Sequence, residues 1–204
     1  MHEHTSPAKK IGPRPLVLGS TSPYRRELLT RLQIPFEVDR PDVDETPMPG
    51  ELPVDLALRL AVAKARDVSL RHPNAIVIGS DQVADLDGTP LGKPITHERA
   101  TEQLRRMRGK TVIFQTALAV VCLESGFEQS ELAQVKVKFR DLDDDEIERY
   151  LRAEQPYDCA GSAKSEGLGI ALLERIDNDD PTALIGLPLI RTCHLIRAAG
   201  GHIL

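Results

Sequence analysis

The chain has 204 residues, of which 41% are apolar and 28% charged, and it carries a net charge of −5 at pH 7. This size and balance are those of a globular protein with one substantial core. The acidic charge and the 3% of aromatic residues disfavour a nucleic-acid-binding surface, so we expect no nucleic-acid polymer as a partner. No apolar run approaches the roughly 20 residues of a membrane span, so we expect no membrane either.

The N-terminal segment and the cysteines indicate where the protein resides. Residues 1–13 lack the apolar centre of a signal peptide, and we expect a flexible tail before a single domain at 14–204. His2 and His4 are interpreted as part of that tail rather than as metal ligands. Cys122, Cys159 and Cys193 lie far apart without CxxC spacing, which predicts reduced thiols in a cytoplasmic protein.

Strand and helix patterns alternate along the first half of the chain. In chain order we expect a strand at 16–19, a helix at 23–33, a strand at 36–39, an acidic loop at 42–50, a helix at 53–71 and a buried strand that starts at 75 and ends in Gly-Ser-Asp-Gln.

The second half continues the alternation, which indicates an α/β fold. We expect a hairpin tip at 87–88, a helix at 97–108, strands at 111–123 and 131–139, a helix from the capping residue at 143 to 154, a glycine-rich loop at 159–169 and a helix at 188–199.

The stretch GSTSPYRRELL, at 19–29, places two arginines on the first turn of a helix. Ser22 and Pro23 are favourable N-cap and N1 residues, so the helix start is well defined. Cations oppose the positive end of the helix dipole unless an anion lies between them. We therefore predict that Arg25 and Arg26 bind phosphate. A solvated helix face is the alternative interpretation.

Lys64 interrupts an apolar stripe on the helix at 53–71. Ala57, Leu60, Ala61 and Val68 define the stripe at helical spacing, and the lysine falls where a core residue is expected. The side chain either extends along its methylene groups to the surface or delivers a cation to a cleft.

Two further charged residues follow the central strand. Asp81 is predicted at the carboxyl end of that strand, where open α/β sheets bind ligands, and it is expected to orient water, bind a divalent ion or cap a turn. Lys93 lies in the tight loop Gly92-Lys93-Pro94. Its cation either serves a binding site or has only a local role in the loop. The acidic loop DVDETP at 42–47 either binds Mg²⁺ through its carboxylates or is simply solvated.

Taken together, these segments resemble the Maf family of nucleoside triphosphate pyrophosphatases. The matching pieces are STSPYRRELL (20–29), VDET (43–46), RLAVAKA (59–65), GSDQV (79–83), GKP (92–94), AGSAKSEGLG (160–169) and GLPL (186–189). The resemblance covers residues 14–198. It implies an elongated, ITPase-like α/β fold with a mixed sheet and a central nucleotide-binding cleft, and a homodimer.

The resemblance also implies an activity and a set of site residues. Family members hydrolyse the bond between the α- and β-phosphates of a nucleotide with a divalent cation, Mg²⁺, Mn²⁺ or Co²⁺. The residues implied to bind the phosphates are Ser20, Arg25, Arg26, Lys64 and Lys93. Glu45 is implied to serve the metal, and Asp81 to act as proton acceptor or metal-linked base.

Three positions indicate the substrate. Tyr24, Gln82 and Glu166 resemble the branch of the family that acts on 7-methyl-GTP in the clearance of modified nucleotides, although Trp is common in place of Tyr24. Two alternatives remain: a pyrophosphatase for dTTP, UTP or another non-canonical nucleotide, and a non-hydrolytic nucleotide-binding regulator of septum formation.

Overall fold

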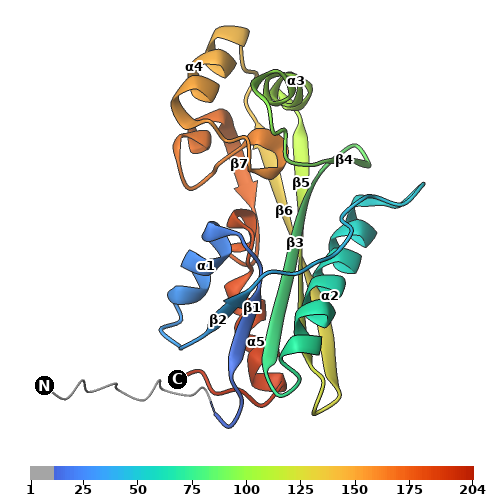
Figure 1. The fold of residues 1–204 in the computed structure, drawn as a ribbon. Coiled ribbons are helices and arrows are strands. Elements are labelled where there is room, and N and C mark those ends of the chain that lie inside the picture. Colours follow the sequence, from blue (N-terminus) through green and yellow to red (C-terminus); the bar gives the residue numbers. More distant parts are fainter. Residues whose placement is uncertain (1–11) are drawn as a thin grey trace, which may run out of the picture.

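The computed structural model describes residues 12–204, which form an elongated α/β molecule (Figure 1). Its seven-stranded mixed sheet has the order β2-β1-β3-β5-β6-β7, and β4 pairs with β3. The strands are β1 (Leu16–Gly19), β2 (Glu37–Asp39), β3 (Ile76–Leu86), β4 (Thr89–Leu91), β5 (Thr111–Cys122), β6 (Phe127–Phe139) and β7 (Leu173–Asp177). The helices are α1 (Pro23–Thr30), α2 (Pro53–Arg71), α3 (His97–Met107), α4 (Asp144–Glu154) and α5 (Leu189–Ala198). Short 3₁₀ turns form η1 (Ala160–Ser162), η2 (Leu168–Leu172) and η3 (Ala183–Ile185).

One half of the molecule is built on the parallel strands. β1 pairs in parallel with β2 and with β3, and Gly19 lies opposite Gly79. Apolar residues of α1 and α5 cover one sheet face, and the alanine-rich stripe of α2 covers the other. Figure 1 shows α2 on the side of the sheet away from α1 and α5.

Glycine allows α2 to approach β3 closely. A Cβ at Gly79 would lie 2.3 Å from the Ala61 carbonyl oxygen and 2.6 Å from the Ala65 nitrogen. Ala57, Ala61 and Ala65 are fully buried, so small side chains face the sheet along the whole contact. This packing places Lys64, which directly precedes Ala65, against Asp81 in the middle of β3.

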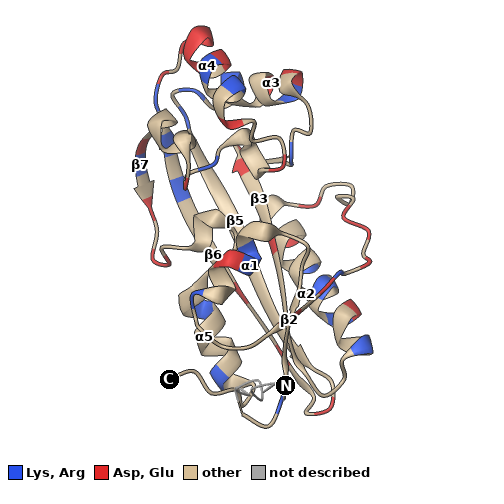
Figure 2. Ribbon diagram, turned by 60° about the vertical axis from the view of Figure 1, so that its left-hand side comes forward, with Lys and Arg blue, Asp and Glu red and all other residues tan. Residues whose placement is uncertain are grey.

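The other half contains the antiparallel ends of β3, β5 and β6. Side chains of these strands pack with α3 and α4 in a second core that includes Leu104, Phe114, Phe139 and Leu151. At the start of α4, the Asp143 carboxylate accepts from Glu146 N at 2.7 Å and the Glu146 carboxylate accepts from Asp143 N at 3.2 Å, which confirms the predicted cap. Basic and acidic residues are interspersed along α2, α3 and α4 (Figure 2).

The predicted α/β class with a mixed sheet is confirmed, but the end of the central strand was predicted wrongly. β3 does not stop at Gly79–Gln82; it continues to Leu86, because β5 pairs with it from Val77 to Asp85, past the point where β1 ends. Asp81 therefore lies in the middle of β3, beside the end of a shorter parallel neighbour. β7 was not predicted at all.

Other boundaries differ less. α1 ends at Thr30, three residues early, and β6 begins at Phe127, four residues before the expected start. Asp87 and Gly88 both have positive φ between β3 and β4, as the predicted hairpin tip requires. No helix among residues 12–204 is long and apolar enough to cross a membrane. The predicted tail with His2 and His4 lies mostly outside the described residues.

Candidate active site

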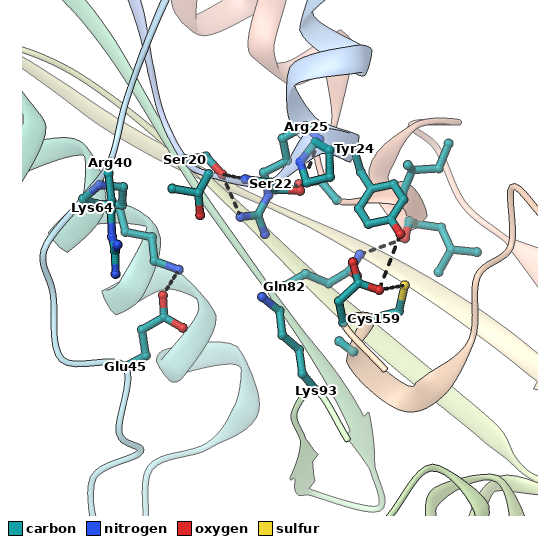
Figure 3. Close-up of a pocket in the computed structure, with 18 of the residues that line it drawn as sticks. Ser20, Ser22, Tyr24, Arg25, Arg40, Glu45, Lys64, Gln82, Lys93 and Cys159 are labelled. Atoms are coloured by element: carbon teal, nitrogen blue, oxygen red, sulfur yellow. Dashed lines mark hydrogen bonds and ion pairs between the residues drawn. The ribbon is translucent and has the colours of Figure 1, made fainter. Parts of the chain in front are cut away.

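A hollow of about 410 Å³ opens beside the middle of β3 (Figure 3). The residues around it come from seven separate segments of the chain, which the fold brings together. They include Ser20, Tyr24, Arg25, Arg40, Glu45, Lys64, Gln82, Lys93, Asp158, Cys159, Glu166 and Gly186. Eight of the ten predicted site residues, Ser20 among them, thus line one hollow, and Asp81, which is 7% exposed, contacts the hollow's Lys64.

The start of α1 supplies donors at the top of this hollow. Ser22 caps the helix by accepting from Arg25 N at 3.4 Å, and Ser20 Oγ accepts from Ser22 N at 3.1 Å. The Arg25 guanidinium donates to Ser20 Oγ at 3.5 Å and to the Gly186 carbonyl at 2.9 Å. Burial lowers the pKa of Arg25, against the opposing charges of Asp81 and Glu45. A partly desolvated guanidinium with neutral partners is well suited to bind an anion.

Lys64 is the most buried cation of the site. Its side chain is 6% exposed, and its ammonium lies 2.7 Å from Asp81 Oδ1 and 2.6 Å from Glu45 Oε1. The alternative in which this lysine extends to the surface is therefore wrong. Burial tends to raise the pKa of Glu45, but the hydrogen bond from Lys64 and the charges of Lys64, Lys93 and Arg25 lower it overall.

Glu45 and Asp81 are the two carboxylates expected to serve a metal, and they converge on one point. The Lys64 ammonium marks that point, bound to one oxygen of each. Residues 12–204 contain no cluster of three or more His, Cys, Asp and Glu residues able to hold a metal. Two oxygen donors fit Mg²⁺ or Mn²⁺, which retain waters and bind phosphate oxygens in sites of this kind. The donor set therefore fits a divalent cation shared with a substrate.

The two remaining predicted phosphate ligands differ in position. Lys93 lines the hollow from the β4–α3 loop, which is held by a hydrogen bond from Ile95 N to the Tyr157 carbonyl at 3.0 Å. Arg26 does not line it; it faces a separate depression with Glu27, outside the α1 N-terminus. Consecutive helical residues point about 100° apart, so one start of α1 directs Arg25 inward and Arg26 away.

The three residues predicted to select the base line the same hollow, and Figure 3 shows Gln82 near its middle, beside Lys93. The Gln82 amide nitrogen donates to Thr116 Oγ1 at 2.9 Å and to the carbonyls of Ala183 and Leu184 at 3.0 Å. Gln82 thereby holds the η3 loop, whose Gly186 carbonyl accepts from Arg25. The residue has a structural role that its sequence position did not reveal.

Lys164 carries a positive charge that lies over the Tyr24 ring and acts on Glu166. The Lys164 ammonium lies 5.7 Å from the centre of the Tyr24 ring, and it pairs with Glu154 at 2.9 Å. Burial raises the pKa of Glu166, and the nearby Lys164 charge opposes that shift. One face of the aromatic ring is thus already in contact with a cation, which a base stacking on that face would have to displace.

Sequence reasoning missed several residues of the hollow. Cys159 was predicted as a reduced thiol but not as part of the site; burial raises the pKa of its thiol to about 12, so it is protonated and unreactive at neutral pH. Gly186, which lines the hollow, and Lys164, which lies over the Tyr24 ring outside that lining, were within the quoted motifs but received no role. Arg40 lay in no motif, and no signal in the sequence singles it out. All three cysteines are free thiols, as predicted.

The fold is elongated and of the α/β class, and its central hollow contains cationic side chains that can bind phosphates and an aromatic ring on which a base can stack. These features are those of a nucleotide-binding protein. The model of the family described as "Maf-like protein" matches residues 15–199, and the chain belongs to this family, as the sequence motifs predicted.

Curated relatives share most of the chain. A protein of Polaromonas sp. (strain JS666 / ATCC BAA-500) is 78% identical over 92% of this chain and 85% of its own length. Relatives from Albidiferax ferrireducens and Aromatoleum aromaticum are 70% and 62% identical, covering 94% and 91% of this chain and 96% and 95% of their own. All three are named 7-methyl-GTP pyrophosphatase. A solved HAM1 protein from Coxiella burnetii aligns with a TM-score of 0.45 and 17% identity over 63% of this chain and 74% of that one.

Proposed function

We propose that this Maf-like protein hydrolyses 7-methyl-GTP to 7-methyl-GMP and diphosphate. The observation that carries the proposal is the single hollow in which Arg25, Lys64 and Lys93 meet beside Asp81, with Tyr24 and Glu166 at its other end. The names of relatives up to 78% identical support the same substrate. The expected location is the cytoplasm, consistent with the three free thiols.

The arrangement of charges suits in-line attack by water on the α-phosphorus. Arg25 and Lys93 bind oxygens on which negative charge increases in the transition state, a large contribution to catalysis in phosphoryl transfer. Asp81 accepts the proton of the attacking water once Lys64 shifts its hydrogen bond from the carboxylate to the phosphates. A divalent cation bound by Glu45 and Asp81 would neutralise phosphate charge.

The base end favours a positively charged purine. Methylation at N7 gives guanine a delocalised positive charge, which the Glu166 carboxylate attracts. A hydrogen bond to a charged group contributes about 1.5–3 kcal/mol, and contact with the Tyr24 ring about 0.5–2 kcal/mol. Because 1.4 kcal/mol corresponds to a tenfold change, a preference over GTP of at least tenfold is expected.

A substrate panel tests the proposal. The protein is incubated with 7-methyl-GTP, GTP, dTTP and UTP in Mg²⁺ or Mn²⁺, and diphosphate release is measured. We expect release from 7-methyl-GTP to exceed that from GTP at least tenfold, and Asp81→Asn to abolish turnover while nucleotide binding persists. Faster hydrolysis of dTTP or UTP than of 7-methyl-GTP would refute the proposed substrate. Binding without release from any nucleotide would instead support the regulatory alternative.

The oligomeric state and the requirement for a divalent cation belong to the same proposal. The family resemblance supports a homodimer, which sedimentation of the purified protein tests directly. A divalent requirement is tested by chelation with EDTA, which should stop diphosphate release, and by adding Mg²⁺, Mn²⁺ or Co²⁺ back. Undiminished turnover after chelation would remove the metal from the reaction.

A further inference from the structure

Arg40 is a cation of the hollow that no motif assigns. It follows β2 directly and lines the hollow together with Lys64 and Glu45. Figure 3 shows its guanidinium on the same side as the Lys64–Glu45 pair, across the hollow from Tyr24. Among residues 12–204, no carboxylate lies within the 4.0 Å of an ion pair with its side chain. Its charge is therefore available to a ligand.

The backbone around Arg40 is fixed to the end of α2. Asp39 accepts from Arg71 Nε at 2.9 Å and contacts His72 Nε2 at 2.9 Å. The hydrogen bond from Arg71 is the main cause of the lowered pKa of Asp39, so this carboxylate remains ionised at neutral pH. Arg71 also donates to the Arg40 carbonyl at 2.7 Å.

The chain is held on the other side of Arg40 as well. Asp42 N donates to Asp67 Oδ2 at 2.9 Å, and the same carboxylate accepts from Arg71 at 3.0 Å. The segment is thus bound to the C-terminal part of α2 at Asp39, Arg40 and Asp42, while the arginine side chain has no such attachment. Because the backbone of this exposed arginine is already fixed beside the hollow, only the side chain has to be ordered when its guanidinium binds an anion.

The order of groups along the hollow indicates which part of a substrate Arg40 meets. Tyr24 lies at one end, Arg25 at the start of α1, and Lys64 with Arg40 at the far end (Figure 3). A nucleotide with its base beside Tyr24 and its α-phosphate beside Arg25 directs its remaining phosphates toward Lys64 and Arg40.

We propose that Arg40 binds the β- and γ-phosphates, the part of the substrate that leaves as diphosphate. The inference rests on the proposed function and adds a ligand for the leaving group. Arg71 is a positioning residue, since it lies outside the hollow and binds the Arg40 carbonyl and the carboxylates of Asp39 and Asp67, which hold this segment. The two products then depend on different residues: the nucleoside monophosphate on the base end and Arg25, and the diphosphate on Arg40 and Lys64.

Product binding separates these contributions. Affinities for inorganic diphosphate and for 7-methyl-GMP are measured by calorimetry in excess Mg²⁺, alongside turnover. We expect Arg40→Ala to weaken diphosphate binding roughly tenfold, or about 1.4 kcal/mol, and to leave 7-methyl-GMP binding within twofold. Arg40→Lys should retain part of the affinity. Arg99→Ala, at an exposed arginine of α3 outside the hollow, is the matched control and should change neither.

A double-mutant cycle tests the positioning role. Arg71→Ala alone should weaken diphosphate binding, but it should add nothing in the Arg40→Ala background if it acts through Arg40. Unchanged diphosphate affinity in Arg40→Ala, or equal losses for both products, overturns the inference; thermal melts confirm that each variant is folded. Because binding is measured directly, a wild-type protein that binds diphosphate but releases none from nucleotides refutes the proposed function and leaves Arg40 testable.

Discussion

Lys64 neutralises the two carboxylates of the site. Its ammonium is the common partner of Asp81 and Glu45, two groups that repel each other without it. The pair with Asp81 is buried, and removal of one partner of a buried ion pair leaves an uncompensated charge. Lysine at this position therefore stabilises the unliganded protein in addition to the phosphate-binding role implied by the family.

Substitution of Lys64 by Met should destabilise the protein and strengthen its response to metal. We expect a loss of about 3 kcal/mol in the free energy of unfolding. The two freed carboxylates should then bind Mg²⁺, so that millimolar Mg²⁺ raises the melting temperature of the variant more than that of the wild type. Equal Mg²⁺ responses in the two proteins would show that Glu45 and Asp81 do not form a metal site.

Glu166 links pH to substrate choice. Desolvation raises its pKa, so the carboxyl group gains a proton earlier as the pH falls than an ordinary glutamate does. Only the ionised form attracts a methylated purine, and the preference for 7-methyl-GTP over GTP should therefore decline as the pH falls through this raised pKa. The ratio of the two kcat/KM values, measured from pH 8 down to pH 5, checks this.

Glu166→Gln removes the titrating group while it keeps the shape of the side chain. We expect roughly a tenfold smaller preference for 7-methyl-GTP and no remaining pH dependence of the ratio. A preference that still falls with pH in this variant would assign the effect to another group. The raised pKa also makes the stability of the protein depend on pH. Because the folded protein holds this proton more tightly than the unfolded chain, Glu166 contributes to the free energy of unfolding at low pH, and this contribution is lost as the pH rises through the raised pKa.

At the scale of elements, the contact between α2 and β3 builds the catalytic centre. Gly79→Ala would place a Cβ 2.3 Å from a backbone oxygen of α2, which cannot move without moving the helix. We expect a loss of about 1–3 kcal/mol in stability and a larger loss of turnover, because Lys64 and Asp81 are carried by the two displaced elements. Denaturant unfolding and diphosphate release measure the two effects.

Gly92→Ala is the control for this change. A Cβ at Gly92 meets nothing within 4 Å and the residue has no positive φ, so stability should stay within about 0.5 kcal/mol of the wild type. If Gly79→Ala were equally harmless, close packing of α2 would not position the site.

Most elements could be predicted from the sequence because their signals are local. The helix at 53–71 has an apolar stripe and an N1 proline, and α4 has a complete capping box. The extension of β3 beyond the predicted Gly-Ser-Asp-Gln end could not be predicted, because it depends on pairing with β5 some 30 residues further on. β7 was missed since Leu173–Asp177 is short, charged and supported only by β6.

The residues of the site also fall into those that a local sequence pattern indicated and those that it did not. Lys64 attracted attention because it breaks a helical pattern, and Arg25 because it adjoins a cap. Arg40 belongs to no recognisable sequence pattern. Its position in the hollow follows from hydrogen bonds that its own carbonyl and the nearby Asp42 N make with Arg71 and Asp67, which are remote in sequence. Arg26 carries the same local signal as its neighbour, and only the three-dimensional direction of the helix separates the two.

At the scale of the molecule, three long strands connect the two halves. β3, β5 and β6 have 11, 12 and 13 residues and contribute side chains both to the core around α3 and α4 and to the cores beside α1, α5 and α2. The hollow draws Arg25 from one half and Cys159 from the other. The continuity of the strands therefore fixes the distance between the phosphate end and the base end.

Shared strands should also make the halves unfold together. Leu104, in α3, is fully buried in one core, and Leu118, in β5, is fully buried in another. Each change to Ala should cost about 2–5 kcal/mol. Each should shift one cooperative transition, monitored both by circular dichroism and by the accessibility of Cys122 to a thiol reagent, because neither half retains a complete sheet without the other. If Leu104→Ala exposed a separate early transition that left Cys122 protected, the half with α3 and α4 would be an independent folding unit, and the strands alone would not hold the two ends of the site in register.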